Sequence, residues 1–195
     1  MKLDSESARV RIVDAAESLF YSRGVQGVGM DEIRSAAGVS LKRLYQLYAA
    51  KDQLVEAVLR RCGERWRARL VLYADAQPPG DQQVLAVFDW LHLWSVEPGF
   101  RGCVFVNIFG ELSFTHPEVA MITRAHKAMF GQYLTELVTA TGRPAVLAAQ
   151  LALLAEGAIT TAAISGSADA ALHARAAARS LLAAVPPPSE PLPPP

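Results

Sequence analysis

The sequence predicts an all-α protein. Of its 195 residues, 51% are hydrophobic, and alanine and leucine make up much of that share, whereas alternating β-branched runs are few. Apolar residues recur instead at three- and four-residue spacing, which is the period of one helix face. Glycine and proline interrupt these segments at intervals that divide the chain into about nine helices.

The first helix is expected from about Ser7 to Arg23, because Ile12, Ala16 and Phe20 form one apolar stripe. Gly24 ends it, and a short glycine-containing connection over residues 25–29 leads to the next segment. Three consecutive short helices in this region would form a small helical head, in which the first helix braces the other two.

Residues 30–51 predict two short helices joined by a tight turn. Gly38 stands where a helix commonly ends in a left-handed residue, and Ser40 can cap the helix that follows. That second helix turns Leu44 inward, while its outward side carries a basic pair, a phenol and an amide: Lys42, Arg43, Tyr45 and Gln46. Cations contact phosphates or guanine edges and amides read adenine, so this pattern predicts a DNA-binding helix-turn-helix. A solvated surface helix is the alternative for either cation taken alone.

The charge distribution favours the same interpretation. The formal net charge of the whole chain is zero. However, residues 1–70 hold 13 Lys and Arg against 9 Asp and Glu, a net charge of +4, and residues 71–195 hold 6 against 10, a net charge of −4. A basic N-terminal third on an acidic remainder is typical of a DNA-binding head on a body that does not bind DNA.

Six further helices are expected, over residues 51–73, 81–97, 103–112, 117–141, 144–165 and 168–184. Asp81 is expected to cap the helix over residues 81–97, and Pro144 is expected to open the helix over residues 144–165. Residues 103–112 could also form a short strand, but Phe105, Ile108 and Leu112 make a helical stripe. The last two helices are rich in alanine and suggest a dimer interface, with an ordinary intrachain bundle as the alternative.

Three functional parts follow: a helix-turn-helix DNA-binding domain over 1–50, a helical effector-binding and dimerisation domain over 51–185, and a disordered proline-rich tail over 186–195. Residues 145–164 form an apolar run, but Glu156 lies near its middle, so a buried bundle helix is expected there and not a membrane span. Cys62 and Cys103 are expected to be buried thiols in a cytoplasmic protein.

Enzyme chemistry finds little support in the sequence. It contains no nucleotide-binding loop, no nucleophile elbow and no Cys/His cluster with metal-ligand spacing, so no catalytic residue, metal or cofactor is assigned. An enzyme would require Asp89, His92, Glu111 or His126 to meet inside the body, and their spacing does not indicate this.

Aromatic residues concentrate between positions 88 and 133. Core packing explains most of them, but effector cavities are also apolar and aromatic with a few placed polar groups. The residues assigned to such a cavity are Phe88, Leu91, His92, Trp94, Ser95, Asn107, Phe109, Glu111, Arg124 and Phe130.

The region from Phe20 to Leu54 resembles the N-terminal DNA-binding domain of the tetracycline-repressor (TetR) family. The matching residues are Phe20, Gly24, Ile33, Ala37, Gly38, Val39, Ser40, Leu44, Tyr45, Tyr48, Lys51, Asp52 and Leu54. The chain departs from the family pattern at Gly29 and Ala50, where a capping Ser or Thr is usual, and at Lys42-Arg43, where Gly-Thr is usual. The resemblance implies a homodimer that binds double-stranded DNA at a palindromic operator and houses a small-molecule effector in its body.

The sequence therefore predicts a ligand-responsive transcriptional repressor with an apolar or aromatic effector. DNA contact is assigned to Met30, Ser40, Leu41, Lys42, Arg43, Tyr45, Gln46, Tyr48 and Lys51. The alternative is a helical protein that binds a small molecule or a partner and whose head has weakened or lost DNA binding, which the missing caps at Gly29 and Ala50 make plausible.

Overall fold

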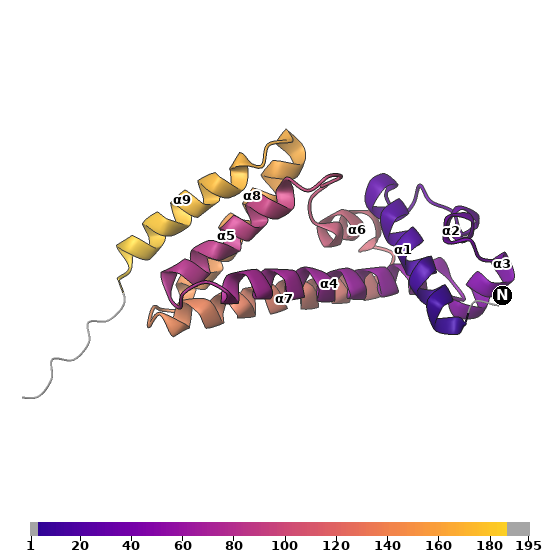
Figure 1. Ribbon diagram of the computed structural model, residues 1–195, viewed down its shortest axis with the longest axis horizontal. Helices are drawn as coiled ribbons and strands as arrows, with labels where there is room; N and C mark the ends of the chain where they lie inside the picture. Colours follow the sequence, from indigo (N-terminus) through magenta and orange to yellow (C-terminus); the bar gives the residue numbers. More distant parts are fainter. Residues whose placement is uncertain (1–3, 187–195) are drawn as a thin grey trace, which may run out of the picture. The chain divides into compact units, whose positions relative to one another are not determined.

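The computed structural model describes residues 4–186, and within that range every regular element is an α-helix. Figure 1 labels the nine helices in chain order: α1 (Ser5–Arg23), α2 (Met30–Ala37), α3 (Leu41–Leu47), α4 (Lys51–Asp75), α5 (Asp81–Ser95), α6 (Val104–Leu112), α7 (Pro117–Ala140), α8 (Val146–Ser165) and α9 (Asp169–Ala184). The predicted all-helical class is confirmed. Residues 187–195, which hold nearly all of the predicted disordered tail, lie outside the described range.

The segment that could have been a strand is helix α6. Phe105, Ile108 and Leu112 are buried along one side of it, while Val106 and Asn107 are exposed. Two predicted helix starts were wrong. Gly80, at φ 102°, caps α5, so that Asp81 is already helical, and α8 begins at Val146, two residues after Pro144. The positive φ of Gly80 explains the first difference, because it reverses the chain just before the helix starts.

The chain packs as two compact units. One comprises the chain as far as Trp66 together with Cys103–His126, and the other comprises Arg67–Gly102 together with the chain from Lys127 onwards. The chain crosses between the units three times, inside α4, in the connection between α5 and α6, and inside α7. The division at residue 50 predicted from the sequence concerns function, and it stays a prediction.

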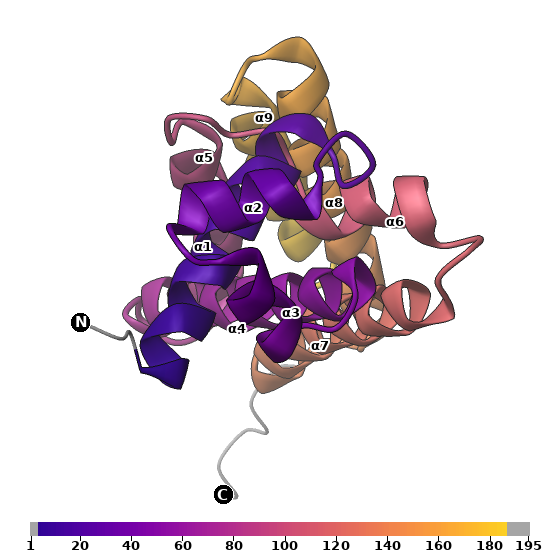
Figure 2. The same cartoon turned by 90° about the vertical axis from the view of Figure 1, so that its right-hand side faces the viewer.

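The first unit is built around α1, which packs on both α2 and α3 (Figure 2). Ile12, Ala16 and Phe20 of α1 are buried, as are Ile33 of α2 and Leu44 of α3. Helix α3 has only seven residues, and an isolated helix of that length is unstable in water. Its conformation therefore depends on this packing.

A charged cluster joins α1 to α4 in the first unit. Glu17 of α1 accepts hydrogen bonds from Arg61, at 2.7 Å, and from Arg65. Burial by itself would raise the pKa of Glu17, but the two guanidinium groups outweigh that effect and leave the pKa below its ordinary value of 4.5. The folded protein therefore favours the charged form of this carboxyl group.

Replacing Glu17 by glutamine should lower the free energy of unfolding by about 2 kcal/mol at pH 7, because hydrogen bonds to charged groups contribute roughly that much. The pKa of Glu17 is lower in the folded state, so its contribution is complete above pH 4.5 and is lost as the pH falls through the folded-state pKa. Urea unfolding of both proteins from pH 7 to pH 3 should show the difference shrinking. The exposed Glu64→Gln is the control, and a difference that stays constant with pH would contradict the assignment.

In the same unit, a carboxylate of α6 accepts hydrogen bonds from the turn between α1 and α2. Glu111 accepts the backbone N–H groups of Val25 at 3.2 Å and Gln26 at 3.0 Å, and the Gln26 side chain donates to the backbone carbonyl of Glu111 at 3.1 Å. Gly24, at φ 77°, approaches so closely that a Cβ atom on it would lie 2.9 Å from the Glu111 carboxylate. Glycine is required here both for its backbone conformation and for space.

In the second unit, α5 packs against α8 and α9, which also pack on each other (Figure 1). A buried arginine closes this bundle at one end. Arg143, which precedes α8, pairs with both carboxylate oxygens of Asp81 and donates to the backbone carbonyls of Val185 and Leu182. One guanidinium group therefore links the start of α5 with the last turn of α9.

Helix α8 is long and apolar enough to cross a membrane by length and composition alone, with a hydropathy of 1.6. Leu151, Ala155 and Ile159 of this helix are buried within the unit. Glu156 accepts two hydrogen bonds of 2.7 Å from Lys127 of α7. The helix is thus a bundle helix, as predicted.

Candidate nucleic-acid interface

The turn between α2 and α3 is built as its sequence predicts. Gly38 adopts the left-handed conformation, at φ 63° and ψ 40°, and its N–H donates to the carbonyl of Ser35 at 3.1 Å. The N–H of Val39 donates to the carbonyl of Arg34 at 3.0 Å. The Ser40 hydroxyl then caps α3 by accepting the N–H of Arg43 at 3.2 Å. These bonds fix the direction in which α3 leaves the turn.

Helix α3 has a buried side and an exposed side. Leu44 is completely buried beneath it, whereas four residues point to solvent and are here called the outward face: Leu41, Lys42, Tyr45 and Gln46. Leu41 and Tyr45 are unusual in being large and apolar yet 41% and 47% exposed. The face therefore offers a cation, an amide and two apolar contacts, a set that can meet phosphates, base edges and thymine methyl groups in a major groove.

The other residues assigned to DNA from the sequence do not all join this face. Met30, at the start of α2, and Lys51, at the start of α4, are half-buried. Arg43 is half-buried as well, and its Nη2 donates to the Ser5 hydroxyl at 2.7 Å. Tyr48 is only 8% exposed, with the Arg9 guanidinium 5.5 Å from its ring centre. Most of the Tyr48 side chain is therefore buried within the head and is not available to DNA.

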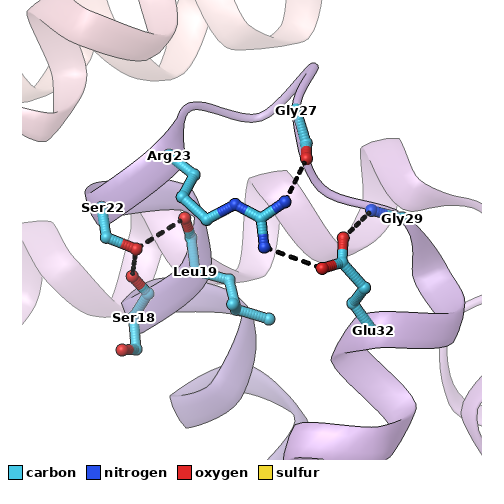
Figure 3. Close-up of polar contacts among 7 residues, drawn as sticks. All are labelled: Ser18, Leu19, Ser22, Arg23, Gly27, Gly29 and Glu32. Carbon is cyan, nitrogen blue, oxygen red and sulfur yellow. Dashed lines mark hydrogen bonds and ion pairs between the residues drawn. The ribbon is translucent and has the colours of Figure 1, made fainter.

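The two helix starts that lack a capping side chain each have a hydrogen bond from the backbone before the helix to a side chain one turn into it. Gly29 precedes α2 without a side-chain oxygen, but Glu32 reaches back and accepts its N–H at 3.2 Å (Figure 3). Arg23 binds Glu32 at 2.7 Å and donates to the Gly27 carbonyl at 2.9 Å. The hydrogen bond from Arg23, with that from Gly29, holds the pKa of Glu32 below its ordinary value.

The start of α4 follows the same plan. Gln53 accepts the N–H of Ala49 at 2.9 Å, so the position next to Ala50 is satisfied from inside the helix. These two bonds restrain the backbone that leads into each helix, but neither Gly29 nor Ala50 offers a side-chain oxygen to the first helical turn or to a phosphate.

The residues assigned to an effector cavity are divided between the two compact units. Phe88, Leu91 and Phe130 are buried in the second unit, where Trp94, His92 and Ser95 are half-buried on α5. His92 Nδ1 lies 3.1 Å from the carbonyl of Ala168, and Ser95 donates to the carbonyl of His92 at 2.8 Å. The remaining four belong to the first unit, in which Asn107 and Arg124 are exposed, Phe109 is half-buried and Glu111 binds the α1–α2 turn.

One aromatic group escaped the sequence assignment. His126 of α7 is buried and stacks on Phe105, with 3.7 Å between ring centres and 3° between planes, and Trp66 meets its edge at 5.3 Å. Gly63 lies under both rings, because a Cβ atom there would be 3.1 Å from Phe105 and 3.2 Å from His126 Nδ1. A glycine in the middle of the long helix α4 was the signal for this close approach.

Metal chemistry has no candidate among the described residues. Across residues 4–186, no group of three or more His, Cys, Asp and Glu side chains is placed to hold a metal ion. Both cysteines are buried free thiols, as predicted. Burial, with the nearby charge of Glu17, raises the pKa of the Cys62 thiol to about 12, so it stays protonated and unreactive near neutral pH.

Comparisons with known proteins agree with a DNA-binding head on a helical body. Residues 12–58 match the family of bacterial regulatory proteins of the tetR type. The fold is similar to the crystal structure of a TetR-family transcriptional regulator from Streptomyces coelicolor, with a TM-score of 0.85 and 29% sequence identity over 92% of this chain and 96% of that one. A TetR regulator from Chloroflexus aurantiacus gives a TM-score of 0.79 at 26% identity over 92% of this chain and 96% of that one.

Among curated proteins, an uncharacterised HTH-type transcriptional regulator of Mycobacterium tuberculosis is 34% identical over 90 residues, which are 46% of this chain and 45% of that protein. The HTH-type transcriptional activator FasR of Mycolicibacterium smegmatis is 42% identical over 60 residues, 31% of this chain and 27% of its own. The chain thus matches less than half the length of either relative. The head carries these sequence matches and the whole chain carries the structural one: residues 12–58 match the tetR family of regulatory proteins, and the chain as a whole has the fold of a TetR-family transcriptional regulator.

Proposed function

We propose that the protein is a homodimeric, DNA-binding transcriptional repressor of the cytoplasm whose affinity for DNA responds to a small molecule. The observation that carries this proposal is the outward face of α3. This face is exposed, whereas the opposite side of the helix packs into the head through the buried Leu44. Each head would place α3 in a major groove, and the two-fold symmetry of a dimer would select a palindromic operator with half-sites about one helical turn apart, or a multiple of it.

On this face Lys42 and Gln46 would contact base edges, and Tyr45 and Leu41 would make apolar contacts with the DNA. All four are exposed, and Lys and Gln have the donors and acceptors that distinguish guanine and adenine edges. Met30, Ser40 and Lys51 stand at helix starts, where backbone N–H groups and short side chains meet phosphates. Arg43 and Tyr48 would contribute at the edge of the interface.

Dimerisation would use α8 and α9. Three large apolar side chains of α8 are exposed, Leu153 at 74%, Ile164 at 83% and Val146 at 66%, and Leu172 of α9 is exposed as well. Exposed apolar residues on two adjacent helices are typical of an interaction surface. A second copy of the chain is the occupant that a symmetric DNA-binding protein requires.

The effector is expected to be apolar or aromatic, because the side chains assigned to it are mostly of that kind. Trp94 packs edge-on against Phe100 at 5.0 Å and stacks near Trp90 at 5.7 Å, so α5 ends in an aromatic group that remains partly accessible. A ligand bound there could release DNA only if it bound the DNA-free conformation more tightly than the DNA-bound one.

The proposal is tested by selecting from a library of randomised duplex DNA with the purified protein and sequencing the enriched duplexes. A palindromic consensus is expected, bound at least about a thousandfold more tightly than a scrambled duplex. A reporter placed behind that duplex then shows whether the protein represses or activates. If the selection enriches no sequence, the proposed function is wrong.

Replacing Lys51 by alanine should weaken binding to all duplexes equally and lower the slope of log affinity against log salt by about one, because each phosphate contact releases about one counterion. Titrations of the selected duplex at several salt concentrations measure this slope. Arg124→Ala, which removes an exposed cation elsewhere in the first unit, is the matched control. An unchanged slope in Lys51→Ala would exclude Lys51 from the interface.

A second function remains open, in which the helical body binds a small molecule or a partner and the head has lost DNA binding. The observation in its favour is that neither Gly29 nor Ala50 offers a hydroxyl group to a phosphate. Against it stand the intact turn at Gly38 and the hydrogen bonds by which Glu32 and Gln53 restrain the backbone before α2 and α4. Under this alternative, the selection experiment would enrich nothing although the protein is folded.

A further inference from the structure

The unusual arginine of the recognition helix does not extend freely into solvent. Arg43 Nη2 donates to the Ser5 hydroxyl at 2.7 Å, across 38 positions of sequence. Ser5 is the first residue of α1, and Asp4 caps that helix by accepting the N–H of Ser7 at 2.8 Å. The first turn of α1 and the first turn of α3 are therefore tied together by one guanidinium group.

We infer that Ser5 is a positioning residue for DNA recognition, which holds the Arg43 guanidinium ready to contact one fixed place on the operator. This inference rests on the proposed function. It makes the first turn of α1 a determinant of sequence preference, although Ser5 itself touches no base.

The chemistry of arginine supports this role. A guanidinium group has five N–H donors in a rigid plane, so one bond to Ser5 leaves the other donors for the O6 and N7 atoms of guanine. A free arginine side chain loses rotamer entropy when it is immobilised, and a bond that already restrains it lowers that loss on binding. Neighbouring Lys42 is exposed on the outward face, and no such bond to it is observed among the described residues.

Ser5 and Arg43 also lie where such support would be effective. The backbone N–H of Arg43 is bound to the Ser40 cap at 3.2 Å, so the main chain of this residue is fixed at the start of α3. Its side chain is half-buried. With the backbone held by Ser40 and the guanidinium by Ser5, both ends of the residue are restrained before DNA arrives.

The test compares Ser5→Ala with wild type on the duplex selected by the wild-type protein and on a scrambled duplex of the same length. Loss of one hydrogen bond should weaken binding to the selected duplex about three- to tenfold. Affinity for the scrambled duplex, and the salt slope, should not change. Ser5→Thr keeps the hydroxyl acceptor and should restore the preference, and Ser22→Ala, which removes a hydroxyl at the other end of α1, should have no effect.

A double-mutant cycle with Arg43→Ala isolates the pair. Ser5→Ala should cost nothing further in the Arg43→Ala background, because the group that it positions is gone. An equal loss on both duplexes, or a full loss in the Arg43→Ala background, would overturn the inference while leaving the proposed function intact. A wild-type protein that prefers no duplex would overturn the proposed function and the inference with it. Circular dichroism and melting of each variant identify any loss of fold.

Discussion

Replacing Arg143 by alanine should lower the free energy of unfolding by about 2–4 kcal/mol, because the buried guanidinium group donates to two backbone carbonyls as well as to Asp81, whose own side chain is 47% exposed. Arg143 is 6% exposed, and its Nη2 alone donates to Asp81 at 3.1 Å and to the Leu182 carbonyl at 3.2 Å. The substitution also leaves the carbonyls of Leu182 and Val185 without this donor at the end of α9. Equilibrium unfolding in urea, followed by circular dichroism, measures the change.

Two controls separate this effect from a general loss of positive charge. Arg179→Ala removes an exposed arginine from α9 and should change stability by less than about 0.5 kcal/mol. Arg143→Lys keeps the charge but cannot bind both oxygens of Asp81 together with two carbonyls, so it should recover only part of the loss. Equal effects of Arg143→Ala and Arg179→Ala would show that the hydrogen bonds of Arg143 contribute nothing to the free energy of unfolding.

Replacing Gly24 by alanine should destabilise the first unit by about 3 kcal/mol, from backbone strain of 1–3 kcal/mol and from displacement of a carboxylate. Gly24 combines φ 77° with ψ 159°, a region that is almost restricted to glycine. A Cβ atom would also lie 2.9 Å from Glu111 Oε1, and moving that carboxylate would break its bonds to Val25 and Gln26. Denaturant unfolding measures the loss.

Gly110→Ala is the matched control for this substitution. Gly110 lies inside α6, beside Glu111, and nothing comes within 4 Å of a Cβ atom there. Alanine should therefore stabilise the helix by up to about 1 kcal/mol. Combining Gly24→Ala with Glu111→Ala would relieve the steric conflict but leave the strained backbone. The double variant should therefore be more stable than the sum of the two single effects predicts.

Local signals in the sequence were sufficient for the helices and for the helix-turn-helix. Gly24 and Gly38 each have positive φ at the helix end where the sequence predicted a stop. The stripe of Phe105, Ile108 and Leu112 decided correctly between a helix and a strand. Such features depend on neighbours a few residues away, and the preferences of those neighbours can be read directly from the chain.

Long-range contacts could not be predicted in the same way. Glu111 was assigned to an effector cavity because of its position in an aromatic region, yet its carboxylate holds a turn 85 residues earlier in the chain. Arg43 was expected to face DNA directly, and the bond to Ser5 depends on how α1 crosses α3. Gly63 signals a close approach to α4, but nothing nearby in sequence reveals that Phe105 and His126 are the side chains that pack on it. These residues are determined by tertiary packing.

The exposed apolar residues of α8 have a consequence for how stability is measured. If a second chain covers Leu153 and Ile164, unfolding is linked to dissociation, and by mass action the melting temperature rises with protein concentration. A variant studied at a tenth of the wild-type concentration would then look less stable even if its fold were unchanged. Comparisons of Arg143→Ala, Gly24→Ala and Glu17→Gln with wild type therefore need a single protein concentration. The dependence on concentration itself reports how tightly the two chains associate.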